Sequence, residues 1–314
     1  MSVMRKLGLA LLLQVVSLSA APVFAQQDQS ASTTTASTTP LPDLKPDASG
    51  KLSQQQMQDL RQIVMDRYRA NYSKQRDYTY IVRRVENKLD GAAGIRFSES
   101  KTYEIMELYG EQVERLISKD DKPLSGGDAA KEEEKIQTLA NQRKNESEED
   151  RAKRRTKENK QREKNREFVR EVADAYDFHL MGTEMLNSRE MWVIAGEPRP
   201  GFQAHLKEAQ ILPKYHGRLW IDKNDLQLAK LDVEAIDTAS FGWILARIHK
   251  GTRLVIERTR VNEEVWLPQH ISFKLDARVA LFKSYNEEDE ETFRDYKKFR
   301  ATAKIVGVGD VQEK

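Results

Sequence analysis

The strongest constraint on the fold of this 314-residue chain is a stretch of strict alternation near its C-terminal end. From Ile271 to Val279 (ISFKLDARV), apolar and polar residues alternate without exception. Successive side chains of a strand point to opposite faces, so this stretch predicts a β-strand with one apolar and one charged face. Residues 231–235 and 254–256 show the same period. The chain therefore needs an antiparallel sheet whose apolar face is covered by other parts of the protein.

Short apolar segments separated by Gly, Asp and Asn turns predict about eleven strands. They are expected at residues 78–82, 98–109, 113–117, 178–185, 189–195, 217–222, 226–235, 241–249, 253–261, 265–281 and 293–305. Strands do not alternate with helices along the chain, which argues against a parallel doubly wound or barrel fold. The predicted fold class is α+β, mostly β: a curved antiparallel sheet, or unclosed β-barrel, lidded by helices and carrying a long charged helical insertion.

Two helices are expected to lie on this sheet. Residues 53–75 begin with the capping residue Ser53, and residues 168–176 carry one apolar stripe. The apolar face of the first helix is formed by Met57, Leu60, Ile63, Val64, Tyr68 and Tyr72. Two helices cannot tile a sheet of about eleven strands, so we expect the sheet to curl around a partly covered hydrophobic hollow.

Residues 128–171 interrupt the strand pattern with a run of mixed charge. Glu and Lys or Arg stand three or four residues apart there, and such pairs stabilise an exposed helix. Apolar residues nearly vanish between positions 141 and 167, so the helix has no coiled-coil seam. The preferred interpretation is a solvated insertion at residues 120–175, either one helix or two arms separated by a break at Asn141, Asn145 and Ser147. The alternative is a docking arm for an envelope protein partner.

The first 50 residues have the composition of an export signal followed by a linker. Two basic residues precede an apolar stretch at 7–18, which is shorter than the roughly 20 residues of a membrane-spanning helix. Val23 and Ala25 are small residues where a signal peptidase reads them, so cleavage is expected after Ala25; an uncleaved anchor is the alternative. Residues 26–50 are expected to be a disordered linker. The folded domain is then residues 51–310, located in the periplasm and not membrane-spanning.

Composition argues against several classes of function. The chain has no cysteine, which excludes disulfides, thiolate metal sites, cysteine nucleophiles and lipoprotein acylation. Charged residues make up 32% of the chain but the net charge is only +2, which argues against a nucleic-acid partner. The histidines show no metal-ligand spacing, and neither a nucleophile elbow nor a phosphate loop is present. We therefore expect neither an enzyme nor a bound cofactor or metal.

Two further segments are interpreted from composition alone. The acidic run at residues 287–291 is expected to be a solvated loop rather than a cation site. The Pro-rich connection at 197–213 is either a rim over the hollow or ordinary surface, and the sequence leaves both interpretations open.

Several segments of the chain resemble the LolA/LolB lipoprotein-carrier superfamily, in particular its outer membrane lipoprotein-sorting members. After a signal peptide and an opening helix, the resemblance rests on residues 109–117 (YGEQVERLI), 190–196 (EMWVIAG), 217–223 (GRLWIDK) and 265–268 (VWLP). It implies an unclosed antiparallel barrel whose concave apolar face, lidded by helices, holds acyl chains. Two features depart from the family: the charged insertion, and the absence of the cysteine that anchors LolB-like lipoproteins.

The residues expected to line an acyl-binding hollow are the four tryptophans and apolar residues on neighbouring strands. They are Trp192, Trp220, Phe241, Trp243, Ile244, Leu254, Ile256, Trp266, Ile271, Phe273 and Leu275. The same residues suit an ordinary hydrophobic core. The expected function is a periplasmic, non-enzymatic binder or carrier of lipid or lipoprotein acyl chains. The alternative is a structural or regulatory envelope protein that uses its charged arm and binds no ligand.

Overall fold

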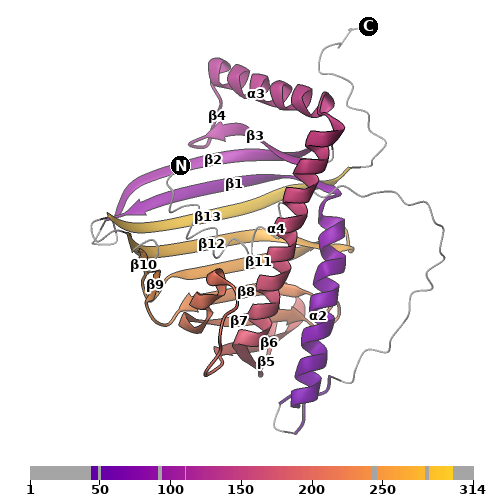
Figure 1. Cartoon of the computed structure of the whole chain (residues 1–314), viewed down its shortest axis with the longest axis vertical. Coiled ribbons are helices and arrows are strands. Elements are labelled where there is room, and N and C mark those ends of the chain that lie inside the picture. The colour runs from indigo at the N-terminus through magenta and orange to yellow at the C-terminus, as the bar shows by residue number, and fades with distance from the viewer. Residues whose placement is uncertain are drawn as a thin grey trace, which may run out of the picture.

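The computed structural model of the protein describes residues 44–48, 51–90, 94–109, 111–241, 246–279 and 283–299. The predicted signal peptide and most of the predicted linker lie outside these residues. The described chain forms one 13-stranded sheet, and two long helices, α2 and α4, run across one of its faces (Figure 1). No helix in this described part is both long enough and apolar enough to cross a lipid bilayer.

The elements follow one another in a simple order along the chain. The helices are α2 (Gln54–Gln75), α3 (Gly126–Lys144), α4 (Glu148–Ala175) and the 3-10 helix η2 (Lys207–Lys214). The strands are β1 (Tyr78–Leu89), β2 (Ile95–Leu108), β3 (Glu111–Lys119), β4 (Lys122–Pro123), β5 (Tyr176–Leu186), β6 (Arg189–Pro198), β7 (Tyr215–Asp222), β8 (Leu228–Ala235), β9 (Ala239–Phe241), β10 (Ala246–Ile248), β11 (Arg253–Val261), β12 (Val265–Val279) and β13 (Lys283–Lys298).

The sheet is antiparallel and open. Its strand order is β4-β3-β2-β1-β13-β12-β11-β8-β7-β6-β5, and the short strands β9 and β10 extend it beside the end of β12. Within the described chain, β4 and β5 stand at opposite ends of this order and do not pair, so the sheet does not close into a barrel. The predicted fold class, an unclosed antiparallel sheet lidded by helices, is confirmed.

Strand β13 corrects two expectations. It begins at Lys283 instead of residue 293, and it places the acidic run 287–291 in the middle of the sheet between β1 and β12, not in a solvated loop. Its carboxylates are matched across the ladder: Glu291 lies 2.8 Å from the Arg84 guanidinium, and Glu288 lies 3.0 Å from the Lys274 ammonium. Opposite charges on neighbouring strands let an acidic segment occupy a central position.

The charged insertion forms two helices, with the break at Asn145. A new N-cap at Ser147 starts α4 by accepting a hydrogen bond from the Asp150 amide. The expectation that the insertion is solvated is wrong for α3, because its Ile136 is buried against Leu108 and Val113 of the sheet. At this end of the sheet, the buried carboxylate of Glu111 pairs with Arg143 at 2.9 Å and also with Arg154.

Two further segments differ from their predicted form. Residues 241–249 were expected as one strand; the structure has β9 ending at Phe241 and β10 beginning at Ala246, with residues 242–245 outside the described chain. The connection after β6 contains η2, which has Ala209 and Leu212 buried beside Phe168 of α4. Helix η2 therefore belongs to the packed structure.

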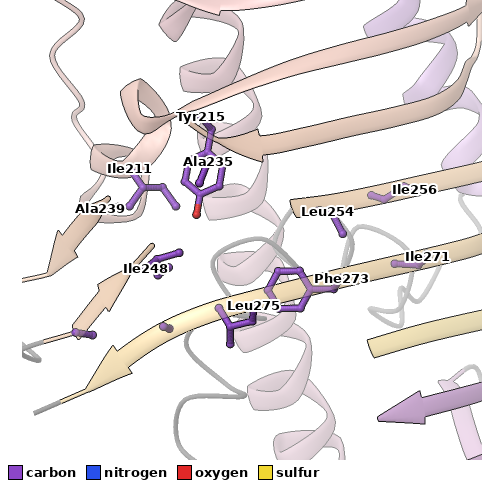
Figure 2. Close-up of a cluster of buried hydrophobic side chains, with 12 residues drawn as sticks. Ile211, Tyr215, Ala235, Ala239, Ile248, Leu254, Ile256, Ile271, Phe273 and Leu275 are labelled. Atoms are coloured by element: carbon purple, nitrogen blue, oxygen red, sulfur yellow. The ribbon is translucent and has the colours of Figure 1, made fainter. Parts of the chain in front are cut away.

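The largest apolar cluster lies on one face of β8, β11 and β12, as the alternation of β12 predicts. It combines Leu254 and Ile256 with Ile271, Phe273 and Leu275, all of which are buried (Figure 2). The hairpin β9–β10 and η2 extend this β11–β12 cluster at one end. Helix α2 covers a second cluster on β5–β7, where its Leu60 is buried among residues that include Ile194 and Ile221.

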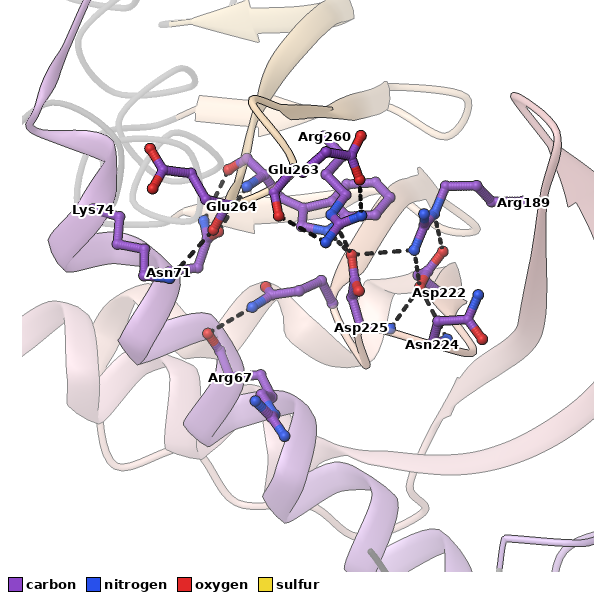
Figure 3. Close-up of polar contacts among 12 residues, drawn as sticks. Arg67, Asn71, Lys74, Arg189, Asp222, Asn224, Asp225, Arg260, Glu263 and Glu264 are labelled. Atoms are coloured by element: carbon purple, nitrogen blue, oxygen red, sulfur yellow. Dashed lines mark hydrogen bonds and ion pairs between the residues drawn. The ribbon is translucent and has the colours of Figure 1, made fainter. Parts of the chain in front are cut away.

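Helix α2 is held to the sheet at its C-terminal half by buried polar contacts. The Asn71 side chain accepts a hydrogen bond from the Trp266 amide at 2.7 Å and donates one to the Trp266 carbonyl at 2.8 Å. Gln75 and Arg258 donate to the same carbonyl. We name Asn71, Gln75, Arg258 and the Trp266 backbone the Trp266 clamp. Figure 3 shows Asn71 of α2 together with the ion pairs of Asp225. Because these side chains satisfy the backbone N–H and C=O groups of Trp266, they fix the position of α2 over the sheet.

Arg258 of the clamp is a buried cationic side chain, which is uncommon in proteins. Its side chain is buried, its guanidinium lies 5.5 Å from the ring centre of Tyr68 on α2, and burial lowers the pKa of Arg258. Burial also raises the pKa of Tyr68 to about 12. The aromatic ring and the Trp266 carbonyl therefore take the place of water around this cation.

We predict that Asn71→Ala lowers the free energy of unfolding by about 2 kcal/mol, since it leaves the buried Trp266 amide without its acceptor. Urea denaturation followed by circular dichroism measures this change. Arg69→Ala is the matched control on the same helix, because within the described residues Arg69 makes an exposed ion pair with Asp66, and its loss should change stability by less than about 0.5 kcal/mol. Equal stability of the two variants would contradict the role of the clamp.

Candidate ligand-binding site

Three cavities meet at one residue, Phe178 of β5, which lines all of them. The first, the η2 pocket, lies between α4, η2 and strands β5–β8 and has a volume of about 120 Å³. The second, the α2 pocket, lies between α2, α4 and the sheet and measures about 130 Å³. The third, which we name the mouth, is formed by the start of α2, the end of α4 and β5, and it measures about 780 Å³.

The η2 pocket exists because two glycines face each other on the sheet beneath it. Gly196 of β6 and Gly217 of β7 are paired residues, and both line the pocket. A Cβ atom at Gly196 would stand 3.0 Å from the Phe178 ring, whereas one at Gly217 would make an ordinary 3.4 Å contact with Val233. Glycine inside a strand often marks a place where another group approaches the backbone closely. Here the two glycines leave the floor of the pocket without side chains.

The α2 pocket lies where α2 and α4 pack side by side on the same part of the sheet. Met57, Leu60 and Val64 recur at helical spacing along α2, and Val169 and Val172 face them from α4. Ile194, Leu219 and Ile221 form the sheet side. Val172 and Leu219 also line the η2 pocket, so the two apolar pockets are neighbours with common walls.

The mouth differs from the two pockets in being charged. It is lined by Lys51, Arg61 and Arg199 among the cations and by Asp174 and Asp177 among the anions. Arg199 pairs with Asp177 at 2.9 Å. Arg61 lines both the mouth and the α2 pocket, and it donates a hydrogen bond to the Ala173 carbonyl of α4 at 3.0 Å. One polar cavity therefore lies beside two apolar pockets and shares wall residues with each of them.

The size of the pockets limits what they hold as they stand. An apolar cavity of about 150 Å³ accommodates a benzene molecule, and pockets for drug-sized ligands measure roughly 300–1,000 Å³. Each apolar pocket here therefore takes a short hydrocarbon segment. A complete long acyl chain requires α2 or α4 to move away from the sheet.

The hydroxyl of Tyr215, which lines the η2 pocket, is buried without a hydrogen-bond partner among the described residues. Figure 2 shows the hydroxyl directed into the β11–β12 cluster. Burial raises the pKa of Tyr215, so the phenol stays neutral. The neighbouring Tyr176 differs, because its hydroxyl donates to the Leu212 carbonyl at 2.8 Å.

The structure distributes the predicted ligand-lining residues over separate clusters. Leu254, Ile256, Ile271, Phe273 and Leu275 belong to the β11–β12 cluster, Trp192 lies in the cluster under α2, and Trp220 and Trp266 lie in a third cluster. Among these residues, Leu254 lines the η2 pocket. Trp243 and Ile244 lie outside the described residues, as does the side chain of Phe241. Their role as ligand-binding residues stays a prediction.

Two of the tryptophans have polar partners that account for their positions. The Trp220 indole donates to Glu184 at 2.7 Å, and the Trp266 indole donates to Asp225 at 2.9 Å. Buried tryptophan usually finds a partner for its N–H group, so both indoles satisfy the ordinary requirements of a core.

Sequence reasoning missed the residues that shape the cavities, namely Phe178, Gly196 and Gly217. The glycines stood at or next to the ends of the predicted strands 189–195 and 217–222, whereas the structure has them inside β6 and β7, where a glycine often marks close approach of another group. Phe178 carried no comparable signal, because an aromatic residue in a strand is typical of any sheet.

In the part of the chain that the structure describes, no group of three or more His, Asp or Glu side chains is placed to hold a metal ion. The histidine of the mouth, His179, is exposed.

We predict opposite effects for alanine at the two paired glycines. Gly217→Ala should leave the free energy of unfolding unchanged or raise it by up to about 1 kcal/mol, because alanine fits there and restricts the unfolded chain. Gly196→Ala should lower it, because its Cβ forces the Phe178 ring to move. Thermal and urea unfolding of the two variants provide the comparison. A Gly196→Ala variant as stable as Gly217→Ala would contradict this description of the floor.

Tyr215→Phe should raise the free energy of unfolding by about 1 kcal/mol, since it removes a buried hydroxyl that has no partner and keeps the ring. Tyr176→Phe is the matched control and should lower stability, because it removes a formed hydrogen bond. Both are measured by urea denaturation. A loss of stability in Tyr215→Phe would show that the hydroxyl has a partner in solution.

Comparison with known proteins gives no match to a family model, and no curated protein matches the sequence. Among solved structures, the chain is similar to a putative outer membrane lipoprotein-sorting protein domain from Vibrio parahaemolyticus, at 10% identity and a TM-score of 0.31, covering 78% of this chain and 95% of that one. It is also similar to a LolA superfamily protein from Nitrosomonas europaea, at 9% identity and a TM-score of 0.26, covering 71% and 86%. A DUF1329 family protein from Desulfovibrio piger matches at 9% identity and a TM-score of 0.24, covering 76% and 95%. Two of these structures carry the names of the superfamily that the sequence segments resemble.

Proposed function

We propose that this protein is a non-enzymatic binder of an amphiphilic ligand, a lipid or the acyl chain of a lipoprotein, in the periplasm. The observation that carries the proposal is that three neighbouring cavities share Phe178 as a wall residue. Two of them are almost wholly apolar and the third is charged, which is the arrangement that a molecule with a hydrocarbon tail and a polar end requires. The tail would occupy the η2 and α2 pockets, with the polar end in the mouth.

The energetics of such binding depend on the length of tail that is buried. Each buried CH₂ group contributes about 0.8 kcal/mol, so a segment of about five groups contributes roughly 4 kcal/mol before association costs. A short segment in the pockets as they stand therefore gives weak binding. Tight binding needs a longer buried tail, and that needs more space under the helices.

The way in which α2 is attached to the sheet would allow the α2 pocket to become larger. Its C-terminal half is fixed by the Trp266 clamp, while Met57, Leu60 and Val64 of the preceding half line the α2 pocket. The Arg61 hydrogen bond to Ala173 links this half to α4. Moving the N-terminal half of α2 away from α4 would enlarge the α2 pocket without disturbing the clamp.

A larger side chain at Gly217, on the floor of the η2 pocket, tests the proposal by filling the pocket. We predict that Gly217→Leu lowers the affinity for a fluorescent fatty-acid probe, 11-(dansylamino)undecanoate, at least tenfold, because the new side chain takes the space of the tail. Gly127→Leu is the control: the same substitution in α3, where a Cβ meets no atom within 4 Å. Affinity is measured by probe fluorescence, and unfolding curves establish that both variants are folded.

A series of fatty acids of increasing length that displace the probe adds a second readout. Affinity should rise by up to about fourfold per CH₂ group until the available space is filled. Unchanged probe affinity in a folded Gly217→Leu variant, or no dependence on chain length, would refute binding of the tail in the η2 pocket. Binding through the charged arm alone, without a ligand, would then be the remaining function.

A further inference from the structure

The middle of α4 concentrates positive charge. Residues 151–166 contain nine Lys or Arg and two Glu, a net charge of +7, whereas the whole chain carries +2. Four lysines lie three or four residues apart, which places them on one side of the helix. We name them the lysine row: Lys153, Lys157, Lys160 and Lys164.

The lysine row faces away from α2. Val169 and Ala173 form the side of α4 that faces α2, since both line the α2 pocket and the Ala173 carbonyl accepts from Arg61. At 100° per residue the four lysines lie on the opposite side of the helix from Val169 and Ala173. All four side chains are exposed. The row extends about 16 Å along the helix axis.

The row is unfavourable for the isolated helix. Like charges three or four residues apart destabilise a helix, and the row contains three such spacings in succession. Lys153 pairs with Glu149 at 2.6 Å, but within the described residues Lys157, Lys160 and Lys164 make no ion pair. The arginine on the sheet side of the same segment, Arg154, is instead fully engaged by Glu111 and Glu146. A negatively charged partner would remove the repulsion along the row.

The row leads directly to the η2 pocket. Lys164 stands one turn before Phe168, which is buried and lines that pocket. Cationic and apolar surface therefore follow each other along the same helix. An anionic lipid is the class of partner that presents phosphate charge and hydrocarbon next to each other.

From these observations we infer that the lysine row is a docking surface for a membrane with anionic phospholipid head groups. Lysine suits this partner because its ammonium is a compact point charge on a flexible stem, which matches phosphates in a fluid layer. The segment offers no aromatic side chain for stacking on bases, and its single apolar residue, Ala152, provides no anchor for a protein interface. Each lysine near an anionic surface strengthens binding by about fivefold.

Vesicle co-sedimentation of the purified full chain tests the inference. We expect binding to vesicles of phosphatidylcholine with 30% phosphatidylglycerol, little binding to phosphatidylcholine alone, and loss of binding as salt rises from 0.05 to 0.5 M, conditions chosen on the basis of charge screening. Replacing the four lysines of the row by Gln should weaken binding at least fiftyfold. The control removes the same charge from exposed lysines elsewhere, Lys119, Lys122, Lys131 and Lys250, and should weaken it less than fivefold.

Three results would overturn the inference: equal binding to both vesicle types, unchanged binding after loss of the row, or tighter binding to duplex DNA than to the anionic vesicles. Binding of soluble short-chain phosphatidylglycerol without binding of vesicles would also overturn it, because the site would then recognise a free head group and not a surface. The dansyl probe separates this test from the proposed function. The row variant should bind the probe as the unaltered protein does, since none of the four lysines lines a pocket.

Discussion

The insertion of β13 between β1 and β12 is the interaction on which the rest of the structure depends. It joins the strands that precede the charged helices to those that follow them, so one sheet exists instead of two separate meanders. The strand achieves this with an acidic sequence, since Glu291 pairs with Arg84 and Glu288 pairs with Lys274. Each cross-strand charge pair contributes only a small stabilising free energy. Here these pairs accompany a hydrophilic strand that forms backbone hydrogen bonds with a neighbour on each side.

The apolar face of this open sheet must be covered by other elements of the chain. Helix α2 covers β5–β7, the end of α4 and η2 cover the neighbouring strands, and the β9–β10 hairpin folds against the β11–β12 cluster. These covering elements are separate helices and a hairpin, and they contact one another along their boundaries. The cavities lie at those edges, around Phe178, because close packing within each cover does not extend across the boundaries between them.

The way in which the covers are attached connects the fold to the proposed function. One end of α2 is fixed by buried polar groups, and its other end rests on apolar side chains that line a pocket. Apolar contacts are non-directional and tolerate sliding, whereas the hydrogen bonds of Asn71 with the Trp266 backbone require one geometry. Helix α4 likewise combines a packed end at Phe168 with an exposed, strongly basic middle. Each long helix thus has one part that defines the fold and another that is available to a ligand or a surface.

The sequence by itself determined the class of the fold and most of its elements. Period-two alternation revealed β12, and apolar residues at helical spacing behind Ser53 revealed α2, because both patterns follow from local backbone geometry. For the charged insertion, the sequence indicated helix but left open whether it forms one helix or two. These features depend on residues that are close together in the chain.

Tertiary structure decided the position of the acidic strand, the packing of α3 and the location of the candidate site. The acidic run forms the central strand β13 through pairing with β1 and β12, where Arg84 and Lys274 lie beside it, and Arg84 is distant in sequence. The predicted lining residues of β11 and β12 are buried in one cluster, while the cavities form where Gly196 meets Gly217 and α2 meets α4. A strand pattern specifies which face is apolar, but the element that covers each part of that face depends on contacts between distant segments, which no local period encodes.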